Sequence, residues 1–115
     1  MLTGAHAIVY TRDADADRAF FRDVLGFDSV DAGDGWLIFA LPPAELAAHP
    51  DAEGGRHELY LMCDDIEATI AELRAKGATV GDATDAGWGL LTSIRLPSGA
   101  ELGLYEPRHP SPLSS

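Results

Sequence analysis

Among the 4 His and 19 Asp and Glu residues of this 115-residue sequence, four could together hold a divalent metal ion: His6, Glu45, Glu58 and Glu101. One imidazole nitrogen with carboxylate oxygens forms a ligand set that suits Fe(II), Mn(II), Ni(II) or Zn(II). A metal held this way could chelate two adjacent substrate oxygens and, as a Lewis acid, stabilise an enolate or a similar anion. A carboxylate that is not a ligand could then move the proton. This chemistry requires that distant segments bring the four side chains together.

The sequence repeats itself, and the repeat predicts how these segments are arranged. Residues 35–50 and 87–107 each run from Gly-Trp through an apolar stretch to Leu-Pro, Ala-Glu-Leu and a closing Pro. Upstream, the apolar runs AHAIVYTRD (5–13) and HELYLMCDD (57–65) each end in acidic residues and lead into a helical pattern. Matches in the same order are the signature of two related structural units.

Each repeat predicts an extended run, one helix and three short strands. The first helix starts near Asp13 and ends at Gly26, and the second starts at its N-cap Asp65 and ends at Gly77. Carboxylates suit helix starts, and glycine suits the left-handed conformation beyond a helix end. Apolar spacing predicts the core-facing helix residues Phe20, Phe21, Val24 and Leu25, then Ile66, Ile70 and Leu73. The expected strands span 27–31, 36–41, 44–49, 79–83, 90–96 and 101–105.

These elements predict an α+β fold of two tandem βαβββ modules, residues 3–50 and 56–107, within one domain of residues 1–110. The Pro/Ser-rich end, residues 111–115, is expected to be a disordered tail. A half of about 50 residues cannot bury a stable core alone, so the two modules must share one. We expect a pseudo-twofold curved sheet around a central cleft. Sheet edges or faces left free in so small a fold favour a homodimer.

Alternation along the strands predicts which side chains face the cleft. The helix-facing set is expected to be Leu59, Leu61, Cys63, Leu102 and Leu104. The opposite face then carries the metal ligands His6, Glu58 and Glu101 and the substrate-binding side chains Tyr10, Tyr60, Met62 and Tyr105. Trp36 and Trp88, at matched repeat positions, are expected to anchor the core or an interface.

One alternative concerns the second metal ligand. Aligning the two repeats on their helix starts pairs His6 with Glu58, which we prefer because Leu59 and Leu61 then face the helix. Aligning them on Gly26 and Gly77 pairs His6 with His57 instead. In that case His57 replaces Glu58, and the site is richer in imidazole.

At these residues the chain resembles the vicinal oxygen chelate superfamily, which includes glyoxalases, bleomycin resistance proteins and extradiol dioxygenases. The resemblance rests on His6, Asp13 and the helix DADRAFFRDVLGF (15–27), and on HELYLMCDDIEATIAELRAKGATV (57–80) followed by LPSGAEL. It spans roughly residues 3–107. It implies the two-module fold, but the superfamily hosts isomerases, dioxygenases, thiol transferases and metal-free binders on one scaffold.

The chain departs from the metal-binding members in two places. The resemblance implies a second histidine where this chain has Glu58, and a glutamate where it has Gly103. His6 matches the first ligand. Gly103 and Ala47 are small, so we expect room for a ligand there. Two functions fit: a metal-dependent lyase, isomerase or dioxygenase acting on adjacent oxygens, and a metal-free binder of a small, antibiotic-like molecule.

Composition narrows the possible partners. The formal net charge of −11 and a pI near 4.4 argue against nucleic acid, which requires clustered Lys and Arg. No apolar run approaches the ~20 residues that span a bilayer. The lone Cys63 excludes an intramolecular disulfide, and the opening residues show no basic region followed by an apolar stretch. We therefore expect a cytoplasmic protein with a small-molecule ligand.

Overall fold

The computed structural model describes residues 6–45, 47, 50, 52–55, 57–110 and 112–113. Its elements confirm an α+β fold, with two helices and two sheets over these residues. In chain order they are α1 Ala14–Asp23, β1 Ser29–Asp31, β2 Leu37–Phe39, β3 Tyr60–Met62, α2 Ile66–Ala75, β4 Thr79–Val80, β5 Thr84–Asp85, β6 Gly89–Arg95 and β7 Glu101–Pro107.

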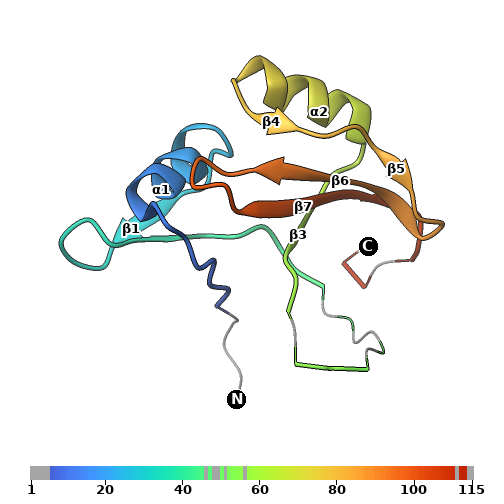
Figure 1. The fold of residues 1–115 in the computed structure, drawn as a ribbon, viewed down its shortest axis with the longest axis horizontal. Helices are drawn as coiled ribbons and strands as arrows, with labels where there is room; N and C mark the ends of the chain where they lie inside the picture. The colour runs from blue at the N-terminus through green and yellow to red at the C-terminus, as the bar shows by residue number, and fades with distance from the viewer. Residues whose placement is uncertain are drawn as a thin grey trace.

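The second half of the chain forms a five-stranded sheet in the order β3-β7-β6-β4, with β5 also paired to β6. The β3–β7 pair is parallel, and β4, β5 and β7 each run antiparallel to β6. Helix α2 covers one face of this sheet (Figure 1). This half has the strand–helix–strand arrangement expected from the repeat, with β5 as an additional short strand.

The core lies between α2 and this sheet. Ile66, Ile70 and Leu73 of α2 are buried, as their spacing predicts, against Ile94, Leu102 and Leu104 of the sheet. Leu59, Leu61 and Cys63 pack on the same core, so the predicted helix-facing set is confirmed. Burial raises the pKa of the Cys63 thiol, which favours the unreactive protonated form.

The first half of the chain differs from the second. It forms α1 and a two-stranded antiparallel sheet, in which Val30 pairs with Ile38. The strands expected over 5–13 and 44–49 do not form in the described residues 6–13, 44, 45 and 47; residues 5, 46, 48 and 49 lie outside the described part. Pro42 and Pro43 have no amide hydrogen, which removes two ladder donors after β2. The pseudo-twofold sheet and its central cleft are therefore not confirmed.

Helix α1 packs against the second half of the chain. It lies beside the turn that joins β6 to β7 (Figure 1). Asp17 is only 1% exposed and accepts hydrogen bonds from the backbone amide of Ser98 at 3.0 Å and from its hydroxyl at 2.8 Å. Phe20, Phe21, Val24 and Leu25 pack against the core, as their spacing predicts.

The helix boundaries follow the predicted signals. The Asp13 carboxylate accepts a hydrogen bond from the Ala16 amide, and the Asp65 carboxylate accepts one from the Ala68 amide, both at 3.1 Å. Gly26 and Gly77, just beyond the two helices, have φ values of 75° and 91°. Both termini of each helix are thus set by local sequence.

The two tryptophans are not part of the core, which corrects one reading of their matched positions. Trp36 is 62% exposed and lies under the Arg18 guanidinium, 4.7 Å from the ring centroid. Trp88 is 45% exposed.

Neither helix of the described residues has the length and apolar character that a membrane-spanning helix needs. Of the predicted tail, residues 111, 114 and 115 lie outside the described part.

Candidate functional site

The sheet face turned away from α2 carries the candidate site. Strand register places Tyr60, Gly103 and Ser93 in one row across β3, β7 and β6. The next row carries Tyr105 and Leu91, followed by Thr84 of β5. Because alternate residues of a strand share a face, these side chains lie opposite the buried Leu102 and Leu104. We call this surface the open face.

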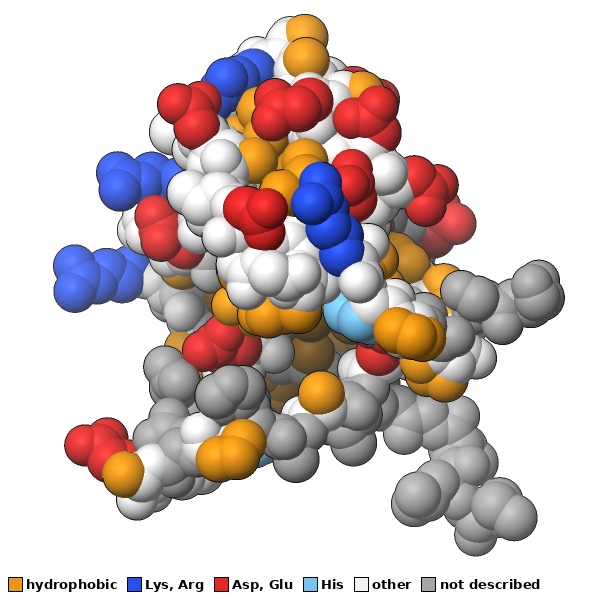
Figure 2. All heavy atoms as spheres, turned by 90° about the vertical axis from the view of Figure 1, so that its right-hand side faces the viewer, with side chains coloured by type: hydrophobic (Ala, Val, Ile, Leu, Met, Phe, Trp, Pro, Cys, Tyr) orange, Lys and Arg blue, Asp and Glu red, His pale blue; other side chains and the backbone are white. Residues whose placement is uncertain are grey.

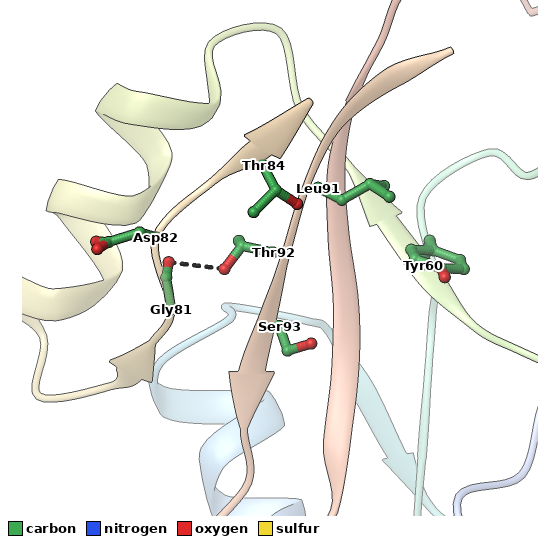
Figure 3. A pocket seen from close by; sticks show the side chains of 7 residues that line it. All are labelled: Tyr60, Gly81, Asp82, Thr84, Leu91, Thr92 and Ser93. Carbon is green, nitrogen blue, oxygen red and sulfur yellow. Dashed lines mark hydrogen bonds between the residues drawn. The ribbon is translucent and has the colours of Figure 1, made fainter. Parts of the chain in front are cut away.

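One hollow lies on the open face near β5 and has a volume of about 380 Å³. We call it the hydroxyl pocket, and its lining consists of Tyr60, Gly81, Asp82, Thr84, Leu91, Thr92 and Ser93 (Figure 3). The Thr92 hydroxyl donates to the Gly81 carbonyl at 2.6 Å. Asp82 forms an ion pair with Arg74 of α2 at 3.1 Å. The pocket therefore combines an aromatic ring, an aliphatic side chain and hydroxyl groups.

A second hollow of about 340 Å³ lies at the other end of the open face. We call it the glutamate pocket because Glu58 and Glu101 line it, together with His57, Ile8, Val9 and Leu59. The Arg95 guanidinium lies 3.9 Å from the Glu101 carboxylate and offsets part of the negative charge there. Tyr60 and Ser93 line both pockets, so the two pockets adjoin.

Tyr60 lies directly over Gly103. A Cβ atom added at Gly103 would overlap Cδ1 and Cε1 of the Tyr60 ring and would lie 2.8 Å from its Cγ. The Tyr60 hydroxyl donates a 2.7 Å hydrogen bond to the Glu58 carboxylate. The room expected at Gly103 is therefore filled by an aromatic ring, which corrects that prediction.

An aromatic cluster of Tyr60, Trp88, Tyr105 and His109 adjoins the two pockets. The Tyr60 ring meets Tyr105 edge-on at a centroid distance of 5.7 Å and Trp88 at 6.3 Å. Tyr105 and His109 are stacked at 6.0 Å. The view in Figure 2 shows hydrophobic side chains in a recess, with acidic side chains spread over the surrounding surface.

Tyr105 is the buried member of this cluster, at 7% exposure. Its hydroxyl donates a 3.0 Å hydrogen bond to Glu45, and His109 Nε2 lies 3.4 Å from the same oxygen. Burial raises the pKa of Tyr105 to about 12, and the Glu45 carboxylate adds to the shift by accepting the hydrogen bond and by its charge. Glu45 thus ties the segment after β2 to the last strand.

The predicted metal ligands are brought together only in part. Glu58 and Glu101 line one pocket, and His57, the alternative ligand, lines it too. His6 is exposed and lines neither pocket. Within the described ranges, no group of three or more His, Cys, Asp or Glu side chains could hold a metal ion.

The structure places only some of the predicted substrate-binding side chains at or beside the pockets. Tyr60 lines both pockets, and Tyr105 lies next to it in the aromatic cluster. Tyr10 is 88% exposed, and Met62 is half-buried beside Tyr105 without lining either pocket. Of the predicted binding residues, Tyr60 is therefore the one that lines the two pockets.

Sequence reasoning assigned Trp88 to the core or an interface, and it missed His109, Thr84, Leu91 and Ser93. Alternation along residues 89–95 contains the signal for Leu91 and Ser93, because both share a face with Arg95. No comparable signal marks His109. It follows β7, and its contact with Tyr105 depends on how the chain folds back after that strand.

The comparisons with known proteins agree with this architecture. The Glyoxalase/Bleomycin resistance protein/Dioxygenase superfamily model matches residues 4–104. The chain belongs to this superfamily. None of the curated protein sequences matches the chain significantly.

Several solved structures of the glyoxalase superfamily are similar to this chain. TnmS3, an antibiotic binding protein from Streptomyces sp. CB03234, has 24% identity and a TM-score of 0.64, covering 93% of this chain and 99% of that chain. A glyoxalase/bleomycin resistance protein from the same strain has 25% identity and a TM-score of 0.60, covering 84% and 94%. Lactoylglutathione lyase from Agrobacterium tumefaciens has 19% identity and a TM-score of 0.64, covering 90% and 92%.

The described residues fit poorly to the metal site of the glyoxalase superfamily. The resemblance in sequence implies a glutamate ligand at the position of Gly103, and here the Tyr60 ring covers that position. The Glu58 carboxylate, at the position of the second ligand, accepts the hydrogen bond from that same tyrosine.

Proposed function

We propose that this chain binds a small, flat, mainly apolar molecule on the open face, without a metal ion. Ligand sites are typically concave and mostly apolar, with a few polar groups that fix orientation. The Tyr60 ring and Leu91 offer apolar contact, and the hydroxyls of Thr84 and Ser93 offer hydrogen bonds to ligand oxygens.

The observation that carries this proposal is the Tyr60 ring over Gly103. At the centre of the hollowed region, the ring presents an aromatic surface where the resemblance implies a charged side chain that would bind a metal ion. A binding role also has a parallel in TnmS3, which is an antibiotic binding protein of similar fold. The ligand class that suits this surface is a hydroxyl- or carbonyl-bearing aromatic compound.

The second candidate is a metal-dependent lyase, isomerase or dioxygenase with His6, Glu58 and Glu101 as ligands. It is favoured by the two glutamates that line one pocket beside His57. This candidate requires the N-terminal segment to move His6 toward that pocket. The two candidates differ in whether a divalent ion is needed for binding.

Thermal unfolding in the presence of 2-naphthol separates the candidates. A ligand that binds only the folded chain raises the melting temperature. We expect 2-naphthol to raise it equally with EDTA and with added Mn²⁺, Ni²⁺, Zn²⁺ or Fe²⁺, and Tyr60→Ala to reduce the rise. Trp36→Ala is the control, because this exposed aromatic side chain lines neither pocket. A shift that appears only with metal and disappears in His6→Ala would support the enzyme instead.

A second part of the proposal concerns the oligomeric state and the arrangement of the two modules. We propose that the chain works as a homodimer and that the first module, residues 3–50, completes a cleft with the second, residues 56–107. The β1–β2 sheet supports this, because over the described residues it has two strands only, and a two-stranded sheet alone is marginally stable. A cytoplasmic location remains a prediction from the sequence.

A further inference from the structure

We infer that Tyr60 is a specificity-determining residue, a partition that divides one groove into two compartments and so limits the length of the ligand. This inference rests on the proposed function, because it concerns the same open face. Tyr60 and Ser93 are the residues that the two pockets share. Of these two, Ser93 is small, so the Tyr60 ring forms most of the boundary.

Three contacts hold the ring in this position. Its hydroxyl donates to Glu58 at 2.7 Å, which fixes the far end of the side chain. Gly103 beneath it has no Cβ, which lets the ring lie against the β7 backbone. The edges of Trp88 and Tyr105 close the third side, at centroid distances of 6.3 and 5.7 Å. The ring is thus positioned by side chains from different parts of the chain.

The partition has a consequence for ligand size. Each compartment, at about 380 and about 340 Å³, is near the lower end of the range for small-molecule sites. A ligand of one or two fused rings fits one compartment and stacks on Tyr60. Four fused rings do not exceed either compartment in volume, but their flat outline is longer than that of two rings, so we expect such a ligand to reach the boundary, where the Tyr60 ring blocks it. We therefore assign to this groove hydroxylated arenes of one or two rings.

Two fluorescent phenols test this assignment, 2-naphthol with two fused rings and 1-hydroxypyrene with four. Both are titrated in EDTA against wild type, Tyr60→Ala, Tyr60→Phe and the control Trp36→Ala. Wild type, Tyr60→Phe and Trp36→Ala should each bind 2-naphthol more tightly than 1-hydroxypyrene. Tyr60→Ala should weaken 2-naphthol binding by about tenfold, the factor that one lost aromatic contact can account for, and should strengthen 1-hydroxypyrene binding because the block is removed.

The outcomes separate this inference from the proposed function. If wild type binds neither phenol in EDTA, the proposed function fails and the partition fails with it. If wild type binds 2-naphthol but Tyr60→Ala leaves the ratio of the two dissociation constants unchanged, only the partition is overturned. Should Tyr60→Ala fail to fold, Tyr60→Leu retains apolar bulk while removing the ring, and the same change in ratio is expected of it.

Discussion

Tyr60 and Gly103 depend on each other, because the ring of one occupies the space that a side chain at the other would need. Gly103→Ala should therefore lower the free energy of unfolding by about 1–3 kcal/mol, the usual cost of overpacking. In the Tyr60→Ala background the same change should cost less than about 0.5 kcal/mol. Urea unfolding of the four proteins measures the coupling. Equal costs in both backgrounds would mean that the ring does not lie over Gly103.

Tyr105 gives a prediction at alkaline pH. Its pKa in the folded chain is raised from 10 to about 12, mainly by burial, so the folded state favours the neutral phenol. The stability that this contributes is complete below pH 10 and is lost as the pH rises toward 12. The free energy of unfolding should fall between pH 10 and pH 12. In Tyr105→Phe the free energy of unfolding should fall less steeply over the same range. Parallel slopes for the two proteins in urea unfolding would contradict the burial of this phenol.

Some of the site could be predicted residue by residue, and some could not. Alternation along a strand correctly placed Leu59 and Leu61 in the core and so left Tyr60 on the other face. The position of the Tyr60 ring over Gly103 depends on the register between β3 and β7, which pairs residues that are distant in sequence. No local pattern contains that register.

At the scale of elements, one buried carboxylate joins α1 to the β6–β7 turn. Asp17→Ala would remove two acceptors and leave the Ser98 amide without its partner, so we expect a loss of about 1–3 kcal/mol in the free energy of unfolding. Asp15→Ala is the matched control, because Asp15 lies in the same helix turn with a 98% exposed side chain. Urea unfolding measures both. A loss no greater than that of the control would show that α1 is held by its apolar contacts alone.

Elements with strong local signals were predicted well. Both helices begin at the expected Asp caps, and β6 and β7 fall within a residue or two of their expected bounds. The strand expected over 44–49 was wrong for its described residues 44, 45 and 47, which directly follow Pro42 and Pro43, two residues without a ladder donor. Pairing between strands is a tertiary property, and a repeat in sequence does not guarantee it.

At the scale of the whole molecule, the β1–β2 sheet exposes apolar side chains. Val30 and Ile38 are a cross-strand pair with 67% and 38% exposure. If this surface meets a second copy, light scattering should give a mass near twice 12.2 kDa for wild type and near 12.2 kDa for Val30→Lys. Ala71→Lys adds the same charge on an exposed position of α2 and should leave the dimer intact. A monomeric wild type would contradict the proposed homodimer.

The net charge of −11 acts on the whole molecule and gives no information on the site by itself. The ligand is selected by local surfaces: the Tyr60 ring, the hydroxyls of Thr84 and Ser93, and the glutamate pocket beside them. Salt should therefore change the affinity for an uncharged phenol little, which titration of 2-naphthol at low and high salt can check.

A crystal structure with 2-naphthol, with anomalous scattering recorded at metal absorption edges, tests the central proposal most directly. We expect the naphthol ring against Tyr60, its oxygen near Thr84 or Ser93, and no anomalous peak between Glu58 and Glu101. A metal ion bound by those two glutamates, with His6 or His57 completing its ligands and the Tyr60 ring displaced from Gly103, would contradict it.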